Sequence, residues 1–515
     1  MTTRRTRLFA AALSLLCALL ALLFATSSSP LYATNFWTDT NIYFTIGRGM
    51  TRGLMPYRDL FDHKGPLLFI LYALGALVSD ASFAGVFLLQ VLSLACTLFI
   101  GWRIVCLYGE GRLTLAAIPL TAIVSVTCTA YTQGGSAEEF CLPALALGLL
   151  CALLRMREGS ACSRAGRLCA LLGAATGWVF SIKYTDCGLF FGLAFLLLCW
   201  EARACSLPRA VRSALCMAAG FAAILLPQAL YLAANGALGD CVSVYFIQNI
   251  FDYGGEPMSL TGHVYNALAY LRTQSAANPA VAGLAMLGCA WTFGEAAWRR
   301  QRGFLFETLA APVAAGLLLL FAYWGEMAHP YYALVFAALV PLGLAPLGAL
   351  ARVVDRLPAN ALSGRSRPSA GRVAFIAACA PALVLTLAVA PACRALCAAV
   401  PLMDVRREDM AQTVFAQIIN EEENPTLLDL CSLDQGFYLA AGVTPNVRYF
   451  ADNNLNTEEK RAAIEGYLAN GAAQFVVAVY REIGEGYELI AEHSSPFDLN
   501  DMRPYKLYRR IDSLE

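Results

Sequence analysis

The chain has 515 residues, of which 58% are apolar and only 14% are charged, against roughly 25% charged residues in an ordinary soluble protein. This composition excludes a disordered chain, a nucleic-acid-coating protein and a small disulfide scaffold, and it indicates an all-α polytopic membrane protein. The formal net charge of zero hides two unlike parts, because residues 1–403 carry 27 basic and 17 acidic residues whereas residues 404–515 carry 10 and 20.

Apolar segments long enough to cross a bilayer recur along the first part of the chain. A spanning helix needs about 20 apolar residues, and the sequence predicts eleven: 8–26, 83–102, 113–131, 139–154, 168–182, 184–200, 213–234, 278–298, 304–324, 331–350 and 373–400. The first follows three arginines and resembles a signal sequence. Its apolar run is longer than a usual signal core of about 7–15 residues, so we interpret it as an uncleaved anchor and leave cleavage open.

The apolar segment 66–79 decides the predicted topology. It has only 14 residues, and as a span it would invert everything that follows. If it lies in the membrane interface instead, the N-terminal side of the membrane receives 20 of the basic residues and the other side 7. Because basic residues favour the cytoplasmic side, we expect a cytoplasmic N-terminus, an outer C-terminus and a juxtamembrane helix at 66–79. We expect this membrane to be the plasma membrane.

Three sizeable parts then face the outside: loop 27–82, loop 235–277 and tail 404–515. The tail predicts a small α/β extracytoplasmic domain. Its expected elements are helices at 405–420 and 457–468 and strands at 426–430 and 474–480. The expected domains are therefore a transmembrane body, 1–403, and a soluble domain, 404–515.

Loop 27–82 concentrates charge in an otherwise charge-poor body. Eight ionisable residues fall within 26 positions: Asp39, Arg48, Arg52, Arg58, Asp59, Asp62, His63 and Lys64. Polar groups held close to lipid are costly and mark functional paths. The section Asn41–Arg52 predicts a short helix, for which Asp39 could serve simply as the N-cap. Asp59 and Asp62 flank a turn and could equally serve only to pair with Arg58.

Lysine is rare in this chain and is placed unevenly. Of four lysines, only Lys64 and Lys183 lie in the membrane body, against 33 arginines in the whole chain. The topology puts both on the outer face, where two ammonium groups suit a phosphate. Lys64 could also merely snorkel to head groups, and the distribution could reflect chance.

Two further outer segments carry polar residues at span ends. The turn 131–139 puts Glu138 and Glu139 at the outer end of a span, where acids are also favoured simply as caps of a helix N-terminus. The stretch 323–332 brings Glu326, His329 and Tyr331 to the same side, where tyrosines also form interfacial belts. No histidine or cysteine spacing suits a metal, and the cysteines fall mostly in apolar runs, where they pack as small hydrophobes.

Four motifs resemble those of one enzyme superfamily. PYRDLFDHKGPLL at 56–68, GGSAEEFCLPALAL at 134–147, SIKYTD at 181–186 and HPYYALVFAALVPL at 329–342 occur in order along the body. Together they resemble the GT-C polytopic glycosyltransferases, in the bacterial branch related to protein O-mannosyltransferases and the lipid A aminoarabinose transferase. The first motif is fairly specific, and the others are weak singly.

The resemblance implies an enzyme that moves a hexose or pentose from a polyprenyl-phosphate-linked sugar to an extracytoplasmic glycan, lipid or protein acceptor, with inversion. It implies Asp39 as catalytic base and Lys64 and Lys183 as ligands of the donor phosphate. Arg58 is expected as a further cation there, because the leaving phosphate gains negative charge. Substrate contacts are then expected from Asp62, His63, Glu138, Glu139, His329 and Tyr331, with the choice between the two glutamates left open.

Departures from the family pattern leave other points open. Asp39-Thr40 stands where relatives often have Asp-Glu, and His63-Lys64-Gly65 where some have Glu-Lys-Pro. The sequence therefore names no cofactor and leaves a divalent cation open. Retention through a second carboxylate about 5–5.5 Å away also stays open. A transporter or flippase of lipid-linked sugars and a non-catalytic glycan-binding protein are the alternatives.

Overall fold

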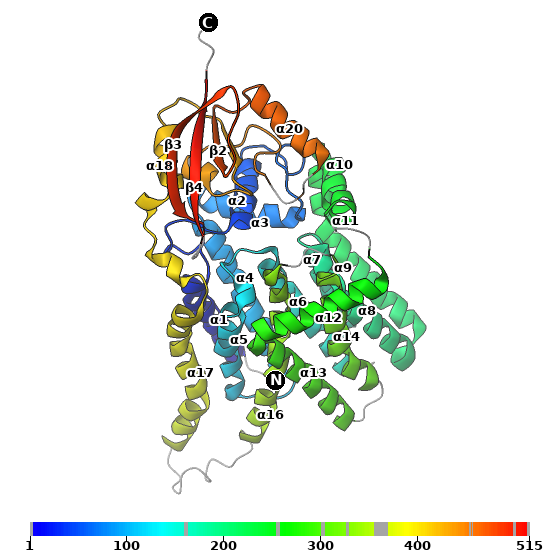
Figure 1. The fold of residues 1–515 in the computed structure, drawn as a ribbon. Helices are drawn as coiled ribbons and strands as arrows, with labels where there is room; N and C mark the ends of the chain where they lie inside the picture. Colours follow the sequence, from blue (N-terminus) through cyan, green and yellow to red (C-terminus); the bar gives the residue numbers. More distant parts are fainter. Residues whose placement is uncertain are drawn as a thin grey trace.

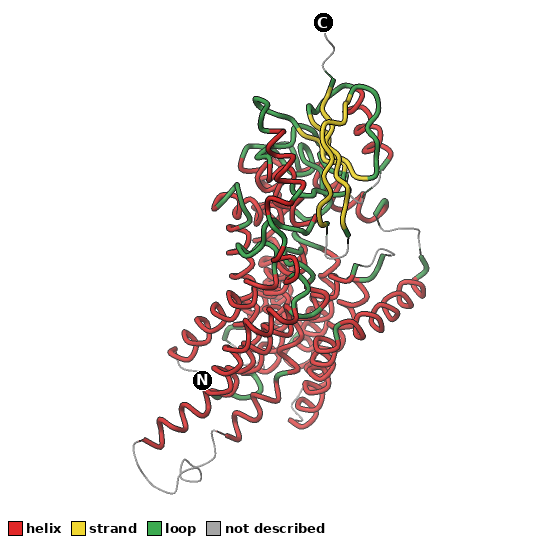
Figure 2. Tube along the Cα trace, turned by 60° about the vertical axis from the view of Figure 1, so that its left-hand side comes forward, coloured by secondary structure: helices red, strands yellow, loops and turns green. Residues whose placement is uncertain are grey.

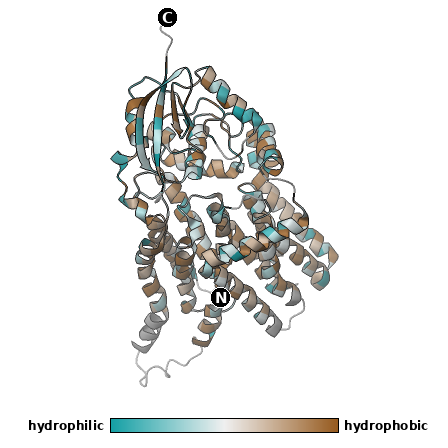
Figure 3. Ribbon diagram, in the orientation of Figure 1, coloured by the Kyte–Doolittle hydropathy of each residue, from teal (hydrophilic) through white to brown (hydrophobic). Residues whose placement is uncertain are grey.

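A computed structural model describes residues 4–158, 163–253, 258–299, 304–325, 329–354, 369–452, 455, 457–497 and 501–511. A bundle of helices makes up most of the molecule, and a small sheet lies at one end of it (Figures 1 and 2). Apolar residues dominate the bundle, whereas hydrophilic residues gather around the sheet and its helices (Figure 3). This division follows the contrast in charge between the two parts of the sequence.

The helical body contains the following elements. Up to residue 158 they are α1 (Arg4–Ala25), α2 (Thr38–Thr51), α3 (Pro66–Val78), α4 (Ala84–Cys106), η1 (Arg112–Ala116), α5 (Ala117–Val126), η2 (Thr129–Tyr131) and α6 (Ala137–Glu158). Next come α7 (Ala165–Phe180), η4 (Tyr184–Cys187), α8 (Gly188–Trp200), η5 (Glu201–Cys205), α9 (Leu207–Ala234), α10 (Leu238–Cys241), η6 (Val242–Gln248) and α11 (Asn249–Phe251). The body ends with α12 (Leu260–Ala277), α13 (Pro279–Arg299), α14 (Phe304–Ala322), η7 (Pro330–Leu339), α15 (Val340–Gly343), α16 (Ala345–Val354) and α17 (Ser369–Leu396).

Seven helices among the described residues are long and apolar enough to cross a membrane, or eight if the bent pair α12–α13 forms one span. Each of the eleven predicted segments is largely helical. Three of the predicted segments fall on apolar helices of only 10–17 residues, which is short for a span. These are Arg112–Val126 (η1 and α5 together), Ala165–Phe180 (α7) and Phe306–Ala322 (within α14). The polytopic helical fold is therefore confirmed, and the number of eleven spans is not.

Helix α3 corresponds to the ambiguous segment 66–79. Its 13 residues rise about 20 Å, which is less than the hydrocarbon thickness of about 30 Å. One face is buried against α2 and α4, and Leu74, Leu77 and Val78 at its end are exposed. Figure 1 shows α2 and α3 between the helical bundle and the sheet.

The C-terminal part combines helices with a four-stranded sheet of order β1-β2-β4-β3. Its elements are η9 (Val400–Asp404), η10 (Arg407–Asp409), α18 (Ala411–Ile419), β1 (Leu427–Leu430), α19 (Phe437–Ala440), α20 (Glu458–Ala469), β2 (Phe475–Val479), β3 (Tyr487–Pro496) and β4 (Met502–Arg510). Strands β1 and β2 are parallel, and β4 pairs antiparallel with both β2 and β3. Every residue of β1 and β2 is buried, which explains why their apolar sequences predicted strands.

The sheet end of the molecule is joined to α2 and the loop that follows it. The Thr45 hydroxyl donates to the Asp434 carboxylate at 2.6 Å, and Arg48 donates to the Tyr438 carbonyl at 3.2 Å. Further along, the amide of Phe61 donates to the carbonyl of Arg448 at 2.9 Å. The first loop is therefore held between the helical body and the C-terminal part.

Candidate active site

Asp39 lies in the first turn of α2. The helix begins at Thr38, with Trp37 as the N-cap residue and no side-chain capping bond, so the expectation that Asp39 caps a helix from Asn41 is wrong. Its carboxylate instead accepts a hydrogen bond of 3.1 Å from the hydroxyl of Tyr331. Asp39 is half-buried, while most of α2 around it is buried. The chain thus directs one partly accessible carboxylate toward residues 329–332, which are almost 300 positions away.

Aromatic rings surround this contact. The ring of Tyr331 meets Trp37 edge to face at 5.2 Å and stacks on His329 at 5.2 Å with an interplanar angle of 13°. Tyr332 contacts both neighbouring rings edge to face. Such rings offer flat apolar faces beside polar edges. His329 and Tyr331, two predicted site residues, are therefore beside Asp39; Glu326 lies outside the described residues.

Lys64 is brought close to the turn that carries Lys183 by a direct backbone contact. The amide of Gly65 donates to the carbonyl of Ile182, and that of Leu67 to the carbonyl of Ser181, both at 3.0 Å. A Cβ atom at position 65 would lie only 2.2 Å from the Ser181 oxygen. Only glycine therefore permits this approach, which explains Gly65 between a lysine and a proline.

Lys183 is held by a carboxylate and a ring. Its ammonium forms an ion pair with Glu138 at the start of α6. The same nitrogen lies 3.2 Å from the ring centroid of Tyr332, within the range of a cation–π interaction. The second carboxyl oxygen of Glu138 has no hydrogen-bond partner among the described residues. Glu138 and Lys183, far apart in sequence, thus form one charged pair.

Glu139 has a different environment from Glu138. Its carboxylate accepts hydrogen bonds from the amide of Gly135 at 2.6 Å, the Tyr131 hydroxyl at 2.8 Å and Gln90 at 3.0 Å. These three donors tie the turn at 131–137 to α4 and α6. Glu139 is therefore placed as a structural ligand of the turn, and Glu138 alone is directed to Lys183.

Electrostatic interactions connect Lys64 to the acidic side chains. Burial opposes the charge of the Lys64 ammonium, yet its pKa lies above the ordinary value because of four neighbouring groups: Tyr253, Asp39, Asp62 and Glu138. Three carboxyl groups from α2, the following loop and α6 therefore act on one buried lysine.

The same groups act on His329. Burial lowers the pKa of its imidazole, and the ammonium groups of Lys64 and Lys183 lower it further. The carboxylates of Asp39 and Glu138 act in the opposite direction. Residues from four distant parts of the sequence thus act on one imidazole. Because the net effect lowers its pKa, His329 is mostly neutral near pH 7.

Asp62 and His63 are buried beside Lys64. One nitrogen of the His63 ring lies 3.2 Å from the Lys64 ammonium, and the other lies 3.4 Å from the Asp62 carboxyl. Burial raises the pKa of Asp62 to about 6, although Lys64 acts against this. Burial and Lys64 lower the pKa of His63 well below its ordinary value. A neutral His63 therefore accepts a hydrogen bond from Lys64 and fixes its position.

Arg58 is not brought to the two lysines. Its guanidinium pairs with the neighbouring Asp59 at 2.6 and 2.8 Å and donates to the carbonyl of Asn235. The Asp59 pairing raises the pKa of Arg58 and lowers that of Asp59. The Arg58 side chain is 42% exposed, and its polar contacts are with Asp59 and Asn235 rather than with Lys64 or Lys183. Its predicted contact with a phosphate stays a prediction that this position does not support.

Two residues of the cluster were missed in the sequence. Asp186 is fully buried, and neither of its carboxyl oxygens has a hydrogen-bond partner among the described residues. Its amide donates to the Lys183 carbonyl, and this three-residue spacing was the signal that could have identified it. The ring of Tyr253 lies 4.7 Å from that of His63, tilted by 34°, and Tyr253 follows no recognisable motif.

Within the described ranges, no three histidine, cysteine, aspartate or glutamate side chains are close enough together to hold a metal ion. Asp39 and Glu138 have Tyr331 and Lys183 as their nearest polar partners rather than a third acidic ligand. In the part of the chain that the structure describes, the acidic side chains therefore do not form a metal site by themselves.

No protein-family model and no curated protein sequence matches the chain. The solved structure of ArnT from Cupriavidus metallidurans bound to undecaprenyl phosphate matches it with a TM-score of 0.61 at 14% identity, covering 100% of this chain and 99% of that one. The Archaeoglobus fulgidus oligosaccharyltransferase complex with Zn and sulfate matches with a TM-score of 0.51 at 15% identity, covering 90% and 68%. At these identities, the matches establish a common fold.

Proposed function

We propose that this chain, which has the fold of the GT-C glycosyltransferases, is a membrane glycosyltransferase. It transfers a hexose or pentose from a polyprenyl-phosphate donor to an extracytoplasmic glycan, lipid or protein. The observation that carries this proposal is the convergence of Lys64 and Lys183, the only lysines of the body, with Asp39 and Glu138. The ArnT structure of the same fold is bound to undecaprenyl phosphate.

Lys64 and Lys183 would bind the donor phosphate. When the bond between the sugar and the phosphate breaks, its electron pair goes to the phosphate oxygen, and negative charge grows there. Two ammonium groups held in a mostly buried environment stabilise that charge more strongly than they would in water. The hydrogen bond with His63 and the ion pair with Glu138 keep both ammonium groups in place before the donor arrives.

Asp39 would act as the general base. An acceptor hydroxyl attacks the anomeric carbon from the face opposite the phosphate, which inverts the configuration there. Its proton passes to the Asp39 carboxylate as the new bond forms, which contributes about 10²–10⁴-fold to the rate. The hydrogen bond from Tyr331 orients this carboxylate. The rings of Trp37, His329 and Tyr331 then offer faces on which a sugar can pack.

Glu138 rather than Glu139 would be the functional acid of the second motif. Glu138 touches Lys183 directly, whereas the three hydrogen bonds of Glu139 come from the local turn and from Gln90 of α4. In this assignment Glu138 positions Lys183 and leaves one carboxyl oxygen for the substrate. Asp62 and His63 act through Lys64, beside which they are buried.

The proposal includes a membrane topology. Eleven spans, a cytoplasmic N-terminus and an outer soluble domain at 404–515 put the cluster on the outer side of the plasma membrane. The excess of basic residues in the loops at the opposite ends of the helices supports this orientation. The contacts of Thr45 and Arg48 join the C-terminal part to α2, the helix that carries Asp39, and this supports the proposal that the domain binds the acceptor.

The test uses purified full-length protein in lipid nanodiscs with a panel of radiolabelled polyprenyl-phosphate sugars and a membrane-glycan extract as acceptor. We expect release of free polyprenyl phosphate with at least one donor. Lys64→Met and Lys183→Met should each weaken donor binding at least tenfold. Lys506→Met, which removes a lysine of the sheet that pairs with Glu482, is the matched control. Failure of folded wild-type protein to bind any donor would contradict the proposal.

A further inference from the structure

A second charged site lies at the opposite end of α6 from the candidate active site. Glu138 is the second residue of this helix and Arg155 is close to its end. At 1.5 Å per residue, the 17 positions between them correspond to about 26 Å. Arg155 therefore belongs to the other side of the bundle, and nothing in the proposed transfer reaction uses it.

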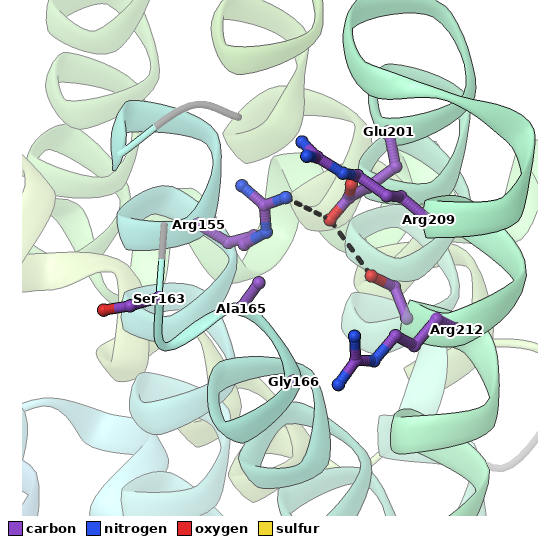
Figure 4. Close-up of a pocket in the computed structure, with 8 residues that line it drawn as sticks. Arg155, Ser163, Ala165, Gly166, Glu201, Arg209 and Arg212 are labelled. Carbon is purple, nitrogen blue, oxygen red and sulfur yellow. Dashed lines mark hydrogen bonds and ion pairs between the residues drawn. The ribbon is translucent and has the colours of Figure 1, made fainter. Parts of the chain in front are cut away.

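A cavity of about 210 Å³ opens beside Arg155. Its charged lining consists of Arg155 from α6, Glu201 from η5, and Arg209 and Arg212 from α9, as Figure 4 shows. Two serines, Ser163 before α7 and Ser213 in α9, complete the polar part of the lining. Three guanidinium groups and one carboxylate leave the lining with a net charge of +2. The charge imbalance favours an anion in this cavity.

The innermost part of this site is rigidly built. Arg155 is 2% exposed and Glu201 is fully buried, and their side chains pair at 2.7 Å. The Ser213 hydroxyl donates to the same carboxyl oxygen at 3.0 Å, and the Arg155 guanidinium lies over the Trp200 ring at 4.9 Å. The single carboxylate is thus already engaged by buried partners and offsets only part of the positive charge.

Arg209 and Arg212 form the outer part of the site. Both lie near the start of α9, whose N-terminal end also favours negative charge. Their positions three residues apart put them on the same face of the helix, and both are exposed at the cavity. Guanidinium groups match the oxygens of a phosphate through paired N–H donors, which is why arginine rather than lysine suits such a ligand.

We propose that this cavity, lined by Arg155, Glu201, Arg209, Arg212 and Ser213, binds a phosphate group on the side of the membrane opposite the candidate active site. Two sources share this chemistry: the head group of an anionic phospholipid in that leaflet, and free inorganic phosphate. Arg209 and Arg212 contact the phosphate, while Arg155, held by Glu201, forms the floor of the site.

The experiment measures phosphate and lipid binding separately, without reference to catalysis. Wild-type protein in phosphatidylcholine nanodiscs is titrated with inorganic phosphate by calorimetry. Retention of phosphatidylglycerol against phosphatidylcholine is measured by native mass spectrometry. The test variant is Arg209→Gln/Arg212→Gln, which leaves the buried Arg155–Glu201 pair intact. The matched control is Arg167→Gln/Arg203→Gln, which removes two exposed arginines near the same end but outside the cavity lining.

We expect wild type and control to bind alike within about twofold and the test variant to bind at least tenfold more weakly, at unchanged melting temperature. Binding of inorganic phosphate alone, or of phosphatidylglycerol alone, supports the site and identifies the source. The proposal is overturned if wild type binds neither ligand. It is equally overturned if the control loses as much binding as the test variant, since general surface charge then explains the effect.

Discussion

Gly65→Ala tests whether the close approach of two loops positions the lysines. The added Cβ would lie 2.2 Å from the Ser181 oxygen and 2.5 Å from the Ser181 carbonyl carbon, whereas ordinary contact begins near 3.4 Å. The backbones would have to separate by about 1 Å. That separation strains the two 3.0 Å hydrogen bonds that join residues 65 and 67 to 182 and 181. A misplacement of about 1 Å costs roughly 10²-fold in rate, so we expect kcat to fall by about that factor.

The assay compares polyprenyl phosphate release, undecaprenyl phosphate binding and melting temperature in the same nanodisc preparations. Gly316→Ala is the matched control, because a Cβ at that helical position meets nothing within 4 Å. We expect the control to behave as wild type and Gly65→Ala to bind undecaprenyl phosphate more weakly. Wild-type turnover by a folded Gly65→Ala protein would refute the argument that this contact sets the distance between Lys64 and Lys183.

Three further predictions concern the same region. Glu138→Gln should lower kcat at least tenfold because Lys183 loses its orienting carboxylate. Glu139→Gln should instead lower the melting temperature with kcat retained. Steady-state rates and melting curves separate the two outcomes. Asp62, whose pKa rises from 3.8 to about 6 on folding, stabilises the folded protein below about pH 4 by roughly 3 kcal/mol relative to pH above 6. The melting temperature should therefore fall more steeply from pH 5 to 7 in wild type than in Asp62→Asn, and parallel curves would contradict this. Thr45→Val leaves the buried Asp434 carboxylate without its 2.6 Å hydrogen bond, which costs about 1–3 kcal/mol; an unchanged melting temperature would show that the contact contributes nothing.

Local sequence patterns were sufficient for much of the fold. Each segment that was predicted as a span from the length of its apolar run is largely helical in the structure. This signal is local, since it needs no knowledge of distant contacts. The buried strands β1 and β2 were evident for the same reason. Strands β3 and β4 were missed because charged and exposed residues, such as Glu488, Glu492 and Arg509, interrupt any apolar run. These strands are specified by their pairing with one another and with β2.

The site was only partly predictable, because its pairings join distant segments. The rarity of lysine selected Lys64 and Lys183, and the structure brings their segments together through Gly65. No local signal separates Glu138 from Glu139; the difference arises from Gln90 and Tyr131, which satisfy only the second. Arg58 was predicted at the phosphate as a further cation, but Asp59 next to it in the chain engages its guanidinium.

Asp39→Asn tests the central claim most directly. Asparagine preserves the size of the side chain and can still accept the hydrogen bond from the Tyr331 hydroxyl, so the geometry should be retained. The ability to take a proton is removed, together with the negative charge that acts on Lys64 and His329. With a donor that wild type uses, we predict that sugar transfer falls about 10²–10⁴-fold while binding of undecaprenyl phosphate persists. Transfer at the wild-type rate by Asp39→Asn would contradict the assignment of Asp39 as the base and, with it, the proposed mechanism.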